Sequence, residues 1–194
     1  MVLATGNAGK AREIQAILGA GYEVLLQSAL GVESVEETGL TFEENALLKA
    51  RYASAATGLP ALADDSGLEV DALQGAPGVR SARYAGADAT DGQNVQRLLD
   101  AMAAVPDGHR QARFRCAVAW VRSADDPQPL LATGAWEGSI AHEPRGTLGF
   151  GYDPVFIDQE SGCSAAEMPP GQKNRLSHRG QALRALVGML APWG

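Results

Sequence analysis

The chain has 194 residues, of which 45% are hydrophobic and 20% are charged, and its formal net charge is −7. Such a length and composition are typical of a globular protein with one domain, or with two lobes that share a core. The acidic balance and the lack of a basic block argue against a nucleic-acid polymer as partner, although a single nucleotide needs only a local group of cations.

No stretch approaches the length of a membrane span and no signal peptide opens the chain, so we expect a soluble, cytoplasmic protein that contacts no membrane. Cys116 and Cys163 do not form a metal-ligand pattern. Cys116 lies within an alternating strand pattern and is expected to be a small core residue. No internal repeat or low-complexity tract is present, and from the chain length we expect a single domain over residues 1–194.

The first segment predicts a short strand at residues 2–4, a glycine-containing turn and a helix. A turn of this kind is a natural anion site, because free backbone N–H groups and the helix dipole point the same way. Lys10 adds a full positive charge. The glycine spacing is too short for a Walker A loop, and Ala11 stands where Ser or Thr would hold magnesium. A plain strand-to-helix turn explains the same residues equally simply.

A second strand at residues 23–26 precedes an acidic loop at residues 32–39 and a long helix. Such a loop is usually just solvated, but Glu37 or a neighbour could complete a metal site. A capping box that begins at Thr41 opens the helix, which runs to about residue 57. Lys49 lies beside the buried stripe of this helix. It either extends towards solvent or is aimed at an anion, and the helix pattern alone favours the first.

Residues 61–67 are the stretch around which the chemistry is expected to gather. A short apolar run predicts a buried strand that delivers Asp64 and Asp65 into a turn at Ser66 and Gly67. Neighbouring strand residues point to opposite faces, so the two carboxylates cannot both be mere surface groups. Buried carboxylates are costly unless they meet a metal, a cation or hydrogen-bond donors. An Asx-type turn that caps the strand is the alternative.

The middle of the chain predicts structural elements. We expect a strand to continue over residues 68–73, and a helix with a second capping box to begin at Thr90 and close at Pro106. Residues 114–120 and 130–136 read as a pair of antiparallel strands, which residues 138–141 can extend.

Two later segments carry candidate ligand-binding residues. Glycines on both sides of Phe150 leave its ring unobstructed, which suits stacking on a flat ligand, and a strand is expected over residues 152–157. A glycine-kinked edge strand is the alternative. Ser177 reads as the N-cap of a final helix, with His178 and Arg179 in its first turn. Because the helix dipole disfavours cations there, Arg179 indicates a nearby anion or acceptor, whereas His178 can be neutral and structural.

Several motifs occur in an order seen in one family: residues 5–10, 36–45 with Lys49, 64–67, 81–84, 111–114, 150–153 and 177–180. On these motifs the chain resembles the inosine/xanthosine triphosphate pyrophosphatases of the RdgB/HAM1 family over residues 2–190. The resemblance implies an α/β fold of the Maf/HAM1-like type. In it, an elongated mixed β-sheet is flanked by helices, and two lobes enclose a central substrate cleft. A homodimer is also implied.

The resemblance implies an activity as well. It is the Mg²⁺-dependent hydrolysis of noncanonical purine nucleoside triphosphates, such as dITP, ITP, XTP and dXTP, to the monophosphate and pyrophosphate. This reaction cleanses the nucleotide pool and prevents incorporation into DNA and RNA. Hypoxanthine and xanthine carry an acceptor at position 6, whereas adenine carries an amino donor. A pocket built from donors would therefore discriminate against ATP.

Roles for individual residues follow from the same resemblance. Asp65 is the general base, and the magnesium ligands are Asp65, Glu37 and Asp64. The triphosphate is expected to bind Thr5, Gly6, Asn7, Ala8, Gly9, Lys10, Lys49 and Lys173. The base and sugar are expected to bind Ser66, Phe150, Gly151, Tyr152, Asp153, Ser177, His178 and Arg179.

Three other interpretations explain some of the same residues. One is a pyrophosphatase of similar fold that acts on modified pyrimidine or standard nucleotides, which the segments around Phe150 and Arg179 argue against through the resemblance. Another is a nucleotide-binding sensor without catalysis, against which the presence of Glu37, Lys49 and Asp65 speaks. A purely structural interpretation explains each turn singly but not these charged and aromatic residues together.

Overall fold

The computed structural model describes residues 1–190, apart from the side chain of Ala20, and the chain forms two compact units. Unit 1 consists of residues 1–65, 116–134 and those from 178 onward, whereas unit 2 consists of residues 66–115 and 135–177. Each unit has its own cluster of buried apolar side chains. The chain passes between the units several times, so neither unit is a continuous stretch of sequence.

Six strands form one mixed sheet in the order β2-β1-β3-β4-β5-β6. The strands are β1 (Val2–Leu3), β2 (Leu25–Leu26), β3 (Ala61–Val70), β4 (Gln111–Val121), β5 (Leu130–Ile140) and β6 (Phe156–Asp158). Strand β1 pairs in parallel with both β2 and β3, whereas β5 pairs antiparallel with β6. The predicted α/β class with a mixed sheet is confirmed.

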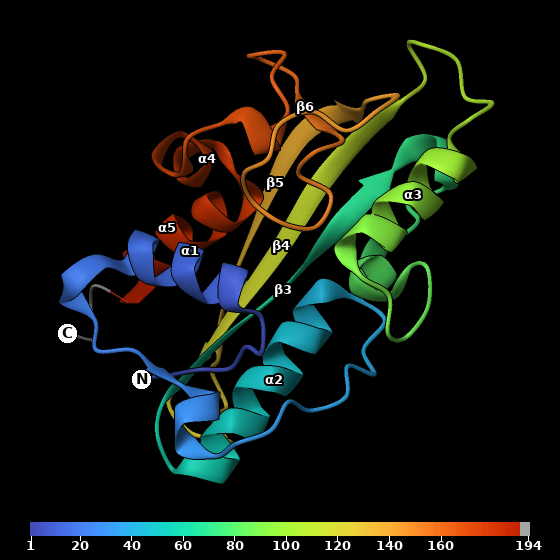
Figure 1. Ribbon diagram of the computed structural model, residues 1–194. Helices are drawn as coiled ribbons and strands as arrows, with labels where there is room; N and C mark the ends of the chain where they lie inside the picture. The colour runs from blue at the N-terminus through green and yellow to red at the C-terminus, as the bar shows by residue number, and fades with distance from the viewer. Residues whose placement is uncertain (191–194) are drawn as a thin grey trace. The chain divides into compact units, whose positions relative to one another are not determined.

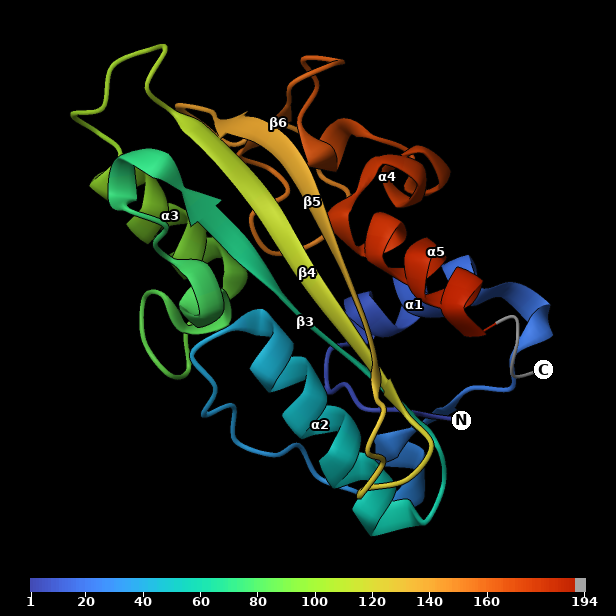
Figure 2. The ribbon, with the colours of Figure 1, turned by 180° about the vertical axis from the view of Figure 1, so that it is seen from behind.

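In unit 1, helices α1 (Ala8–Leu18) and α5 (His178–Leu190) lie side by side in both ribbon views (Figures 1 and 2). Their apolar faces meet Leu62 of β3 in one buried cluster that includes Ile14 and Leu183. Short 3₁₀ turns, η1 (Gly19–Gly21) and η2 (Gln27–Leu30), flank β2. Burial of this cluster is the main force that fixes α1 and α5 on the sheet.

Helix α2 (Phe42–Thr57) has the predicted boundaries. Both hydrogen bonds of the capping box between Thr41 and Glu44 are present, and Gly58 ends the helix with a left-handed φ of 70°. Glycine adopts this conformation without the steric cost of a side chain. Three fully buried alanines, Ala46, Ala50 and Ala53, line one side of α2.

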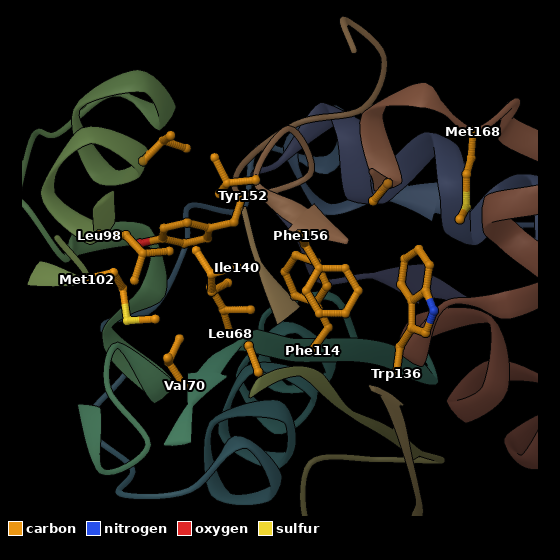
Figure 3. Packing of buried hydrophobic residues seen from close by; sticks show 14 residues of the cluster. Leu68, Val70, Leu98, Met102, Phe114, Trp136, Ile140, Tyr152, Phe156 and Met168 are labelled. Carbon is orange, nitrogen blue, oxygen red and sulfur yellow. The ribbon is translucent and has the colours of Figure 1, made fainter. Parts of the chain in front are cut away.

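Unit 2 packs around aromatic rings, which Figure 3 shows from close by. The ring of Phe156 lies 4.5 Å from that of Phe114 and 5.0 Å from that of Trp136, measured between centroids. The indole of Trp136 donates a hydrogen bond to buried Asp158 at 2.7 Å. The other elements of this unit are α3 (Asp91–Ala101), α4 (Pro170–Leu176), η3 (Asp71–Leu73), η4 (Gly78–Arg83) and η5 (Ala165–Glu167).

The turn expected at Ser66 and Gly67 is wrong, because β3 runs without interruption to Val70. Leu68 and Val70 are fully buried, and the Leu68 N–H donates to the Ser81 hydroxyl at 2.9 Å. Burial and hydrogen bonding therefore outweigh the local turn preference of Ser-Gly. The same strand was expected to extend to residue 73, but η3 begins at Asp71.

Two elements in the C-terminal half of the chain differ from the sequence prediction. The strand predicted from Tyr152 begins only at Phe156, because the preceding residues form turns in which Val155 N–H donates to Tyr152 O at 3.0 Å. Helix α4 was not predicted at all, although Pro170 at its first position is a recognised start signal.

Among residues 1–190, no helix combines the length and apolar content needed to cross a membrane.

Candidate active site

The glycine turn of unit 1 connects β1 to the N-terminus of α1, the kind of turn that favours anions. Asn7 is the N-cap of α1, and its side-chain oxygen accepts from the Lys10 N–H at 3.0 Å. The Thr5 hydroxyl accepts from the Asn7 N–H at 3.2 Å, which fixes the turn between strand and helix. Strand β1 ends at Leu3, which pairs with Leu62 of the parallel strand β3, so the turn after β1 lies close to Asp64 and Asp65 within β3. Gly6 lies in this turn, and Ala8 and Gly9 begin α1.

Asp64 lies within β3, two residues after Leu62, and its side chain is completely buried. One carboxylate oxygen lies 3.3 Å from Lys10 Nζ and accepts from Arg179 Nε at 3.2 Å. The guanidinium of Arg179, itself 2% exposed, also pairs with Glu13 on α1. Burial alone would raise the pKa of Asp64, but Lys10, Arg179 and Lys49 hold it below its usual range. Asp64 therefore favours its ionised form and links β3 to α1 and α5 through Lys10 and Arg179.

Asp65, the next residue, lies on the α2 side of the strand. Its Oδ1 accepts from Lys49 Nζ at 2.9 Å, and its Oδ2 accepts from Asn45 Nδ2 at 3.2 Å. Burial raises the pKa of Asp65 above its usual value; the nearby ammonium groups, that of Lys49 above all, act in the opposite direction, and Glu37 adds to the rise. The carboxylate is thus better able to accept a proton than an exposed aspartate.

Lys49 links Asp65 to the acidic loop. Its ammonium donates to Glu37 Oε1 at 2.6 Å as well as to Asp65. Burial lowers the pKa of Lys49, but Asp65, Asp64 and Glu37 together raise it above the ordinary value. The preference for a lysine that extends to solvent is therefore wrong: buried carboxylates need a cation, and Lys49 supplies it.

The acidic side chains of unit 1 suit a hard divalent cation. Glu37 and Asp65 converge on one ammonium, so their carboxylates lie close together. Magnesium is commonly held by one or two carboxylates and keeps several of its waters. No group of three His, Cys, Asp or Glu side chains with metal-site geometry occurs within residues 1–190. Asp64 lies in its own ion pairs with Lys10 and Arg179. The pair Glu37 and Asp65 is the donor set that fits.

A second cluster lies in unit 2, around Phe150. The ammonium of Lys173 is 4.8 Å from the centroid of the Phe150 ring and 2.5 Å from an oxygen of Asp153. The same oxygen accepts from the Phe150 N–H at 2.8 Å. Gly149 has φ +79°, and a Cβ there would lie 2.0 Å from Asp153, so only glycine fits. Asp153 and Lys173 are both buried, and together they fix the position of the aromatic ring.

The neighbours of Phe150 are also fixed by hydrogen bonds. The Gly151 N–H donates to Asp91 at 2.7 Å, and the Tyr152 hydroxyl donates to Ser81 O at 2.8 Å. Ser177 is buried between α4 and α5, where its N–H donates to Lys173 O at 2.8 Å. Two further predicted site residues are His178, which is buried at the start of α5, and Ser66, which is half-buried on β3.

Two predicted site residues contact protein groups that the predicted roles place at a different part of the substrate or do not include. Lys173, assigned to the triphosphate, contacts Phe150 and Asp153, which were assigned to the base. Arg179, assigned to the base, contacts Asp64 and Glu13. Their roles towards a substrate stay predictions.

Three residues of these clusters were not predicted as site residues: Asn45, Glu13 and Asp91. A signal existed for Asn45, because it precedes Lys49 by four residues on a helix and therefore shares its face. Glu13 and Asp91 had no comparable signal, since each contacts a segment distant in sequence.

Comparison with known proteins gives matches along nearly the whole chain. The model of the Ham1 family matches residues 1–189. A dITP/XTP pyrophosphatase of Photorhabdus laumondii is 57% identical over 191 residues, which cover 98% of this chain and 97% of the relative. That of Escherichia coli K12 is 56% identical over the same shares.

Solved structures agree with these sequence matches. A HAM1 protein from Coxiella burnetii superposes with a TM-score of 0.90 at 49% identity, and the match covers 98% of both chains. A nucleoside-triphosphatase / dITP/XTP pyrophosphatase from Mycobacterium abscessus superposes with a TM-score of 0.76 at 43% identity, over 96% of this chain and 97% of the other. The chain belongs to the Ham1 family.

Proposed function

We propose that this protein hydrolyses dITP, XTP and related noncanonical purine nucleoside triphosphates to the monophosphate and pyrophosphate. Relatives at 56–57% identity carry the name dITP/XTP pyrophosphatase. The observation that carries the proposal is the arrangement of Asp65, Lys49 and Glu37 in the unit that also holds the glycine turn and Lys10. A base, two cations and a helix N-terminus are what hydrolysis of a triphosphate requires.

Binding of the triphosphate falls to the turn before α1 and to the lysines. The first N–H groups of α1 and the helix dipole favour a phosphate at residues 5–10. Lys10 and Lys49 add two positive charges, which contact the adjacent β3 residues Asp64 and Asp65. These groups offset the charge that gathers on pyrophosphate as it leaves.

Asp65 is the proposed general base. Water attacks the α phosphorus as the bond from this atom to the leaving pyrophosphate oxygen breaks. A proton of the water passes to the Asp65 carboxylate. Its raised pKa makes it a better proton acceptor than Asp64, whose carboxylate is held by two cations. Lys49 keeps one oxygen of Asp65 in a fixed position.

We propose Mg²⁺ as the cofactor, with Glu37 and Asp65 as the residues that would hold it. When bound, the ion would neutralise phosphate charge and polarise the reacting groups as a Lewis acid. The direct ligation expected of Asp64 is the weaker part of this assignment, because Asp64 already pairs with Lys10 and Arg179.

Recognition of the base is proposed for unit 2. The Phe150 ring would stack on the purine, and Lys173 already lies 4.8 Å from the centroid of that ring. Donors that face position 6 would accept hypoxanthine or xanthine and would be left unpaired against adenine, a penalty of roughly 1–3 kcal/mol for each unpaired group. The proposed homodimer follows from the resemblance, and sedimentation equilibrium of the purified protein tests it. The cytoplasmic location stays a prediction from the sequence.

The decisive experiment measures pyrophosphate release from dITP, XTP, ATP and GTP, each with Mg²⁺ and with excess EDTA. We expect Mg²⁺-dependent release from dITP and XTP, with ATP and GTP nearly inert. Equal turnover of ATP would refute the base-recognition part and leave the phosphate chemistry intact. Binding of dITP without turnover of any nucleotide would instead support a nucleotide sensor.

A further inference from the structure

Asn45 occupies an unusual position between the acidic loop and the proposed base. It lies on the first turns of α2 and is 1% exposed. Its Oδ1 accepts from the Gly39 N–H at 2.8 Å, and its Nδ2 donates to Gly39 O at 3.4 Å. The same Nδ2 donates to Asp65 Oδ2 at 3.2 Å. One amide therefore holds both a loop peptide and the catalytic carboxylate.

The surroundings fix which way this amide points. The Gly39 N–H needs an acceptor and the Asp65 carboxylate needs a donor, so the amide oxygen faces Gly39 N–H and the amide nitrogen faces Asp65. Gly39 is part of the fit, because a Cβ there would lie 2.7 Å from Asn45 Oδ1 and 2.7 Å from Glu44 Cβ. Glu44 adds a further restraint, since it accepts from the Leu40 N–H at 2.7 Å. The loop that carries Glu37 is thus bound to α2 at consecutive residues.

We propose that Asn45 is a positioning residue of this enzyme. Its amide holds the Asp65 carboxylate and the loop that carries Glu37 in a fixed position relative to each other. Lys49 holds Oδ1 of Asp65 and Asn45 holds Oδ2, so the carboxylate plane is fixed at both oxygens. Lys49 and Asn45 are four residues apart on α2, so one helix face determines both contacts. The inference rests on the proposed function, because it assigns Asn45 a role only through Asp65.

The chain supplies a matched control in unit 2. Asn94 of α3 is 3% exposed and also holds a loop by its amide: Oδ1 accepts from the Ala85 N–H at 2.8 Å, and Nδ2 donates to Ala82 O at 3.1 Å. None of these contacts involves a carboxylate. Replacing Asn94 removes a buried amide clamp without touching the proposed base.

The test compares Asn45→Ala, Asn45→Asp and Asn94→Ala in steady-state pyrophosphate release from dITP and in thermal unfolding. Asn45→Asp keeps an acceptor for the Gly39 N–H but removes the donor to Asp65. We expect both Asn45 variants to lose at least about tenfold in kcat, with KM within threefold of wild type. Asn94→Ala should lower Tm comparably and keep kcat within twofold.

The outcomes separate the two claims. A wild-type protein that releases no pyrophosphate from dITP or XTP refutes the proposed function, and the role of Asn45 with it. With an active wild type, a folded Asn45→Asp that keeps kcat within twofold overturns the positioning role alone. A loss of kcat in Asn94→Ala equal to that in Asn45→Ala would show a general effect of stability and would also overturn it. If Asn45→Ala does not fold, Asn45→Asp decides the question.

Discussion

The adjacent carboxylates Asp64 and Asp65 lie on opposite sides of strand β3, and their surroundings shift their pKa values in opposite directions. On the side of α1 and α5, Asp64 meets Lys10 and Arg179, and its pKa is lowered. On the side of α2, Asp65 shares a single lysine with Glu37, and its pKa is raised. Environments that push the pKa values of neighbouring groups apart are a mark of divided roles. This difference agrees with the roles proposed above, anchoring for Asp64 and proton transfer for Asp65.

The largest expected effect concerns the stability of the Asp64 side. Asp64→Ala leaves buried Arg179 with one carboxylate fewer, and we expect the free energy of unfolding to fall by about 3–5 kcal/mol in urea titrations. Asp71→Ala is the control, because Asp71 pairs with Arg113 on the surface and such pairs contribute about 1 kcal/mol or less. Equal losses in the two variants would mean that Asp64 is no anchor.

On the other side of the strand, the expected effect is on turnover. Asp65→Asn keeps the shape and the contact with Lys49 but cannot accept a proton. We expect kcat for dITP to fall at least ~100-fold, which corresponds to about 2.7 kcal/mol, while the fold and nucleotide affinity are retained. Pyrophosphate release measured at fixed times gives kcat, circular dichroism checks the fold, and equilibrium binding of dITP gives the nucleotide affinity. Turnover close to wild type would move the base role to another residue.

Two outer carboxylates sharpen the comparison. Glu13 pairs with Arg179 on the Asp64 side, and Glu37 pairs with Lys49 on the Asp65 side. Glu13→Gln weakens a buried charged contact, so we expect a loss of about 1.5 kcal/mol in unfolding free energy with kcat within twofold. Glu37→Gln should lower kcat about tenfold with less change in stability, because Glu37 acts on Asp65 and its lysine. The reverse pattern would contradict the division of roles.

The smallest effect is the pH dependence of stability without metal. The lowered pKa of Asp64 means that its stabilisation is present above its unfolded pKa of about 4 and is lost as pH falls through the folded value. The raised pKa of Asp65 gives the opposite sign: its contribution is present below about pH 4 and is lost as pH rises through the folded value.

Urea titrations from pH 3 to 7 in EDTA test these signs. The stability of wild type relative to Asp64→Asn should decrease by about 1 kcal/mol towards low pH. Relative to Asp65→Asn, the stability of wild type should decrease towards high pH. Slopes of the same sign for the two variants would show that the carboxylates do not differ.

Local signals determine much of the fold. The boundaries of α2 could be predicted because the capping box at Thr41 and the αL residue Gly58 lie within the helix termini themselves. The strand character of β3 was also predictable from its apolar run, but its length was not. Its continuation past Ser66 and Gly67 depends on the burial of Leu68 and on the hydrogen bond that the Leu68 N–H donates to the Ser81 hydroxyl, thirteen residues away.

The candidate site was only partly predictable for the same reason. Asp65, Glu37 and Lys49 were named from their motifs, and the structure brings them together. Whether Lys49 extends to solvent or meets carboxylates depends on contacts between a helix, a loop and a strand, which helical periodicity does not encode. The ion pair between Asp64 and Arg179 joins residues 115 positions apart, so no local pattern could show it.

The measurement that tests the central claim most directly is ³¹P NMR of dITP incubated with Mg²⁺ and either the wild-type protein or Asp65→Asn. The account predicts dIMP and pyrophosphate in equal amounts with wild type, and at least ~100-fold slower formation of both with the variant. Release of orthophosphate and dIDP, or equal rates for the two proteins, would contradict it.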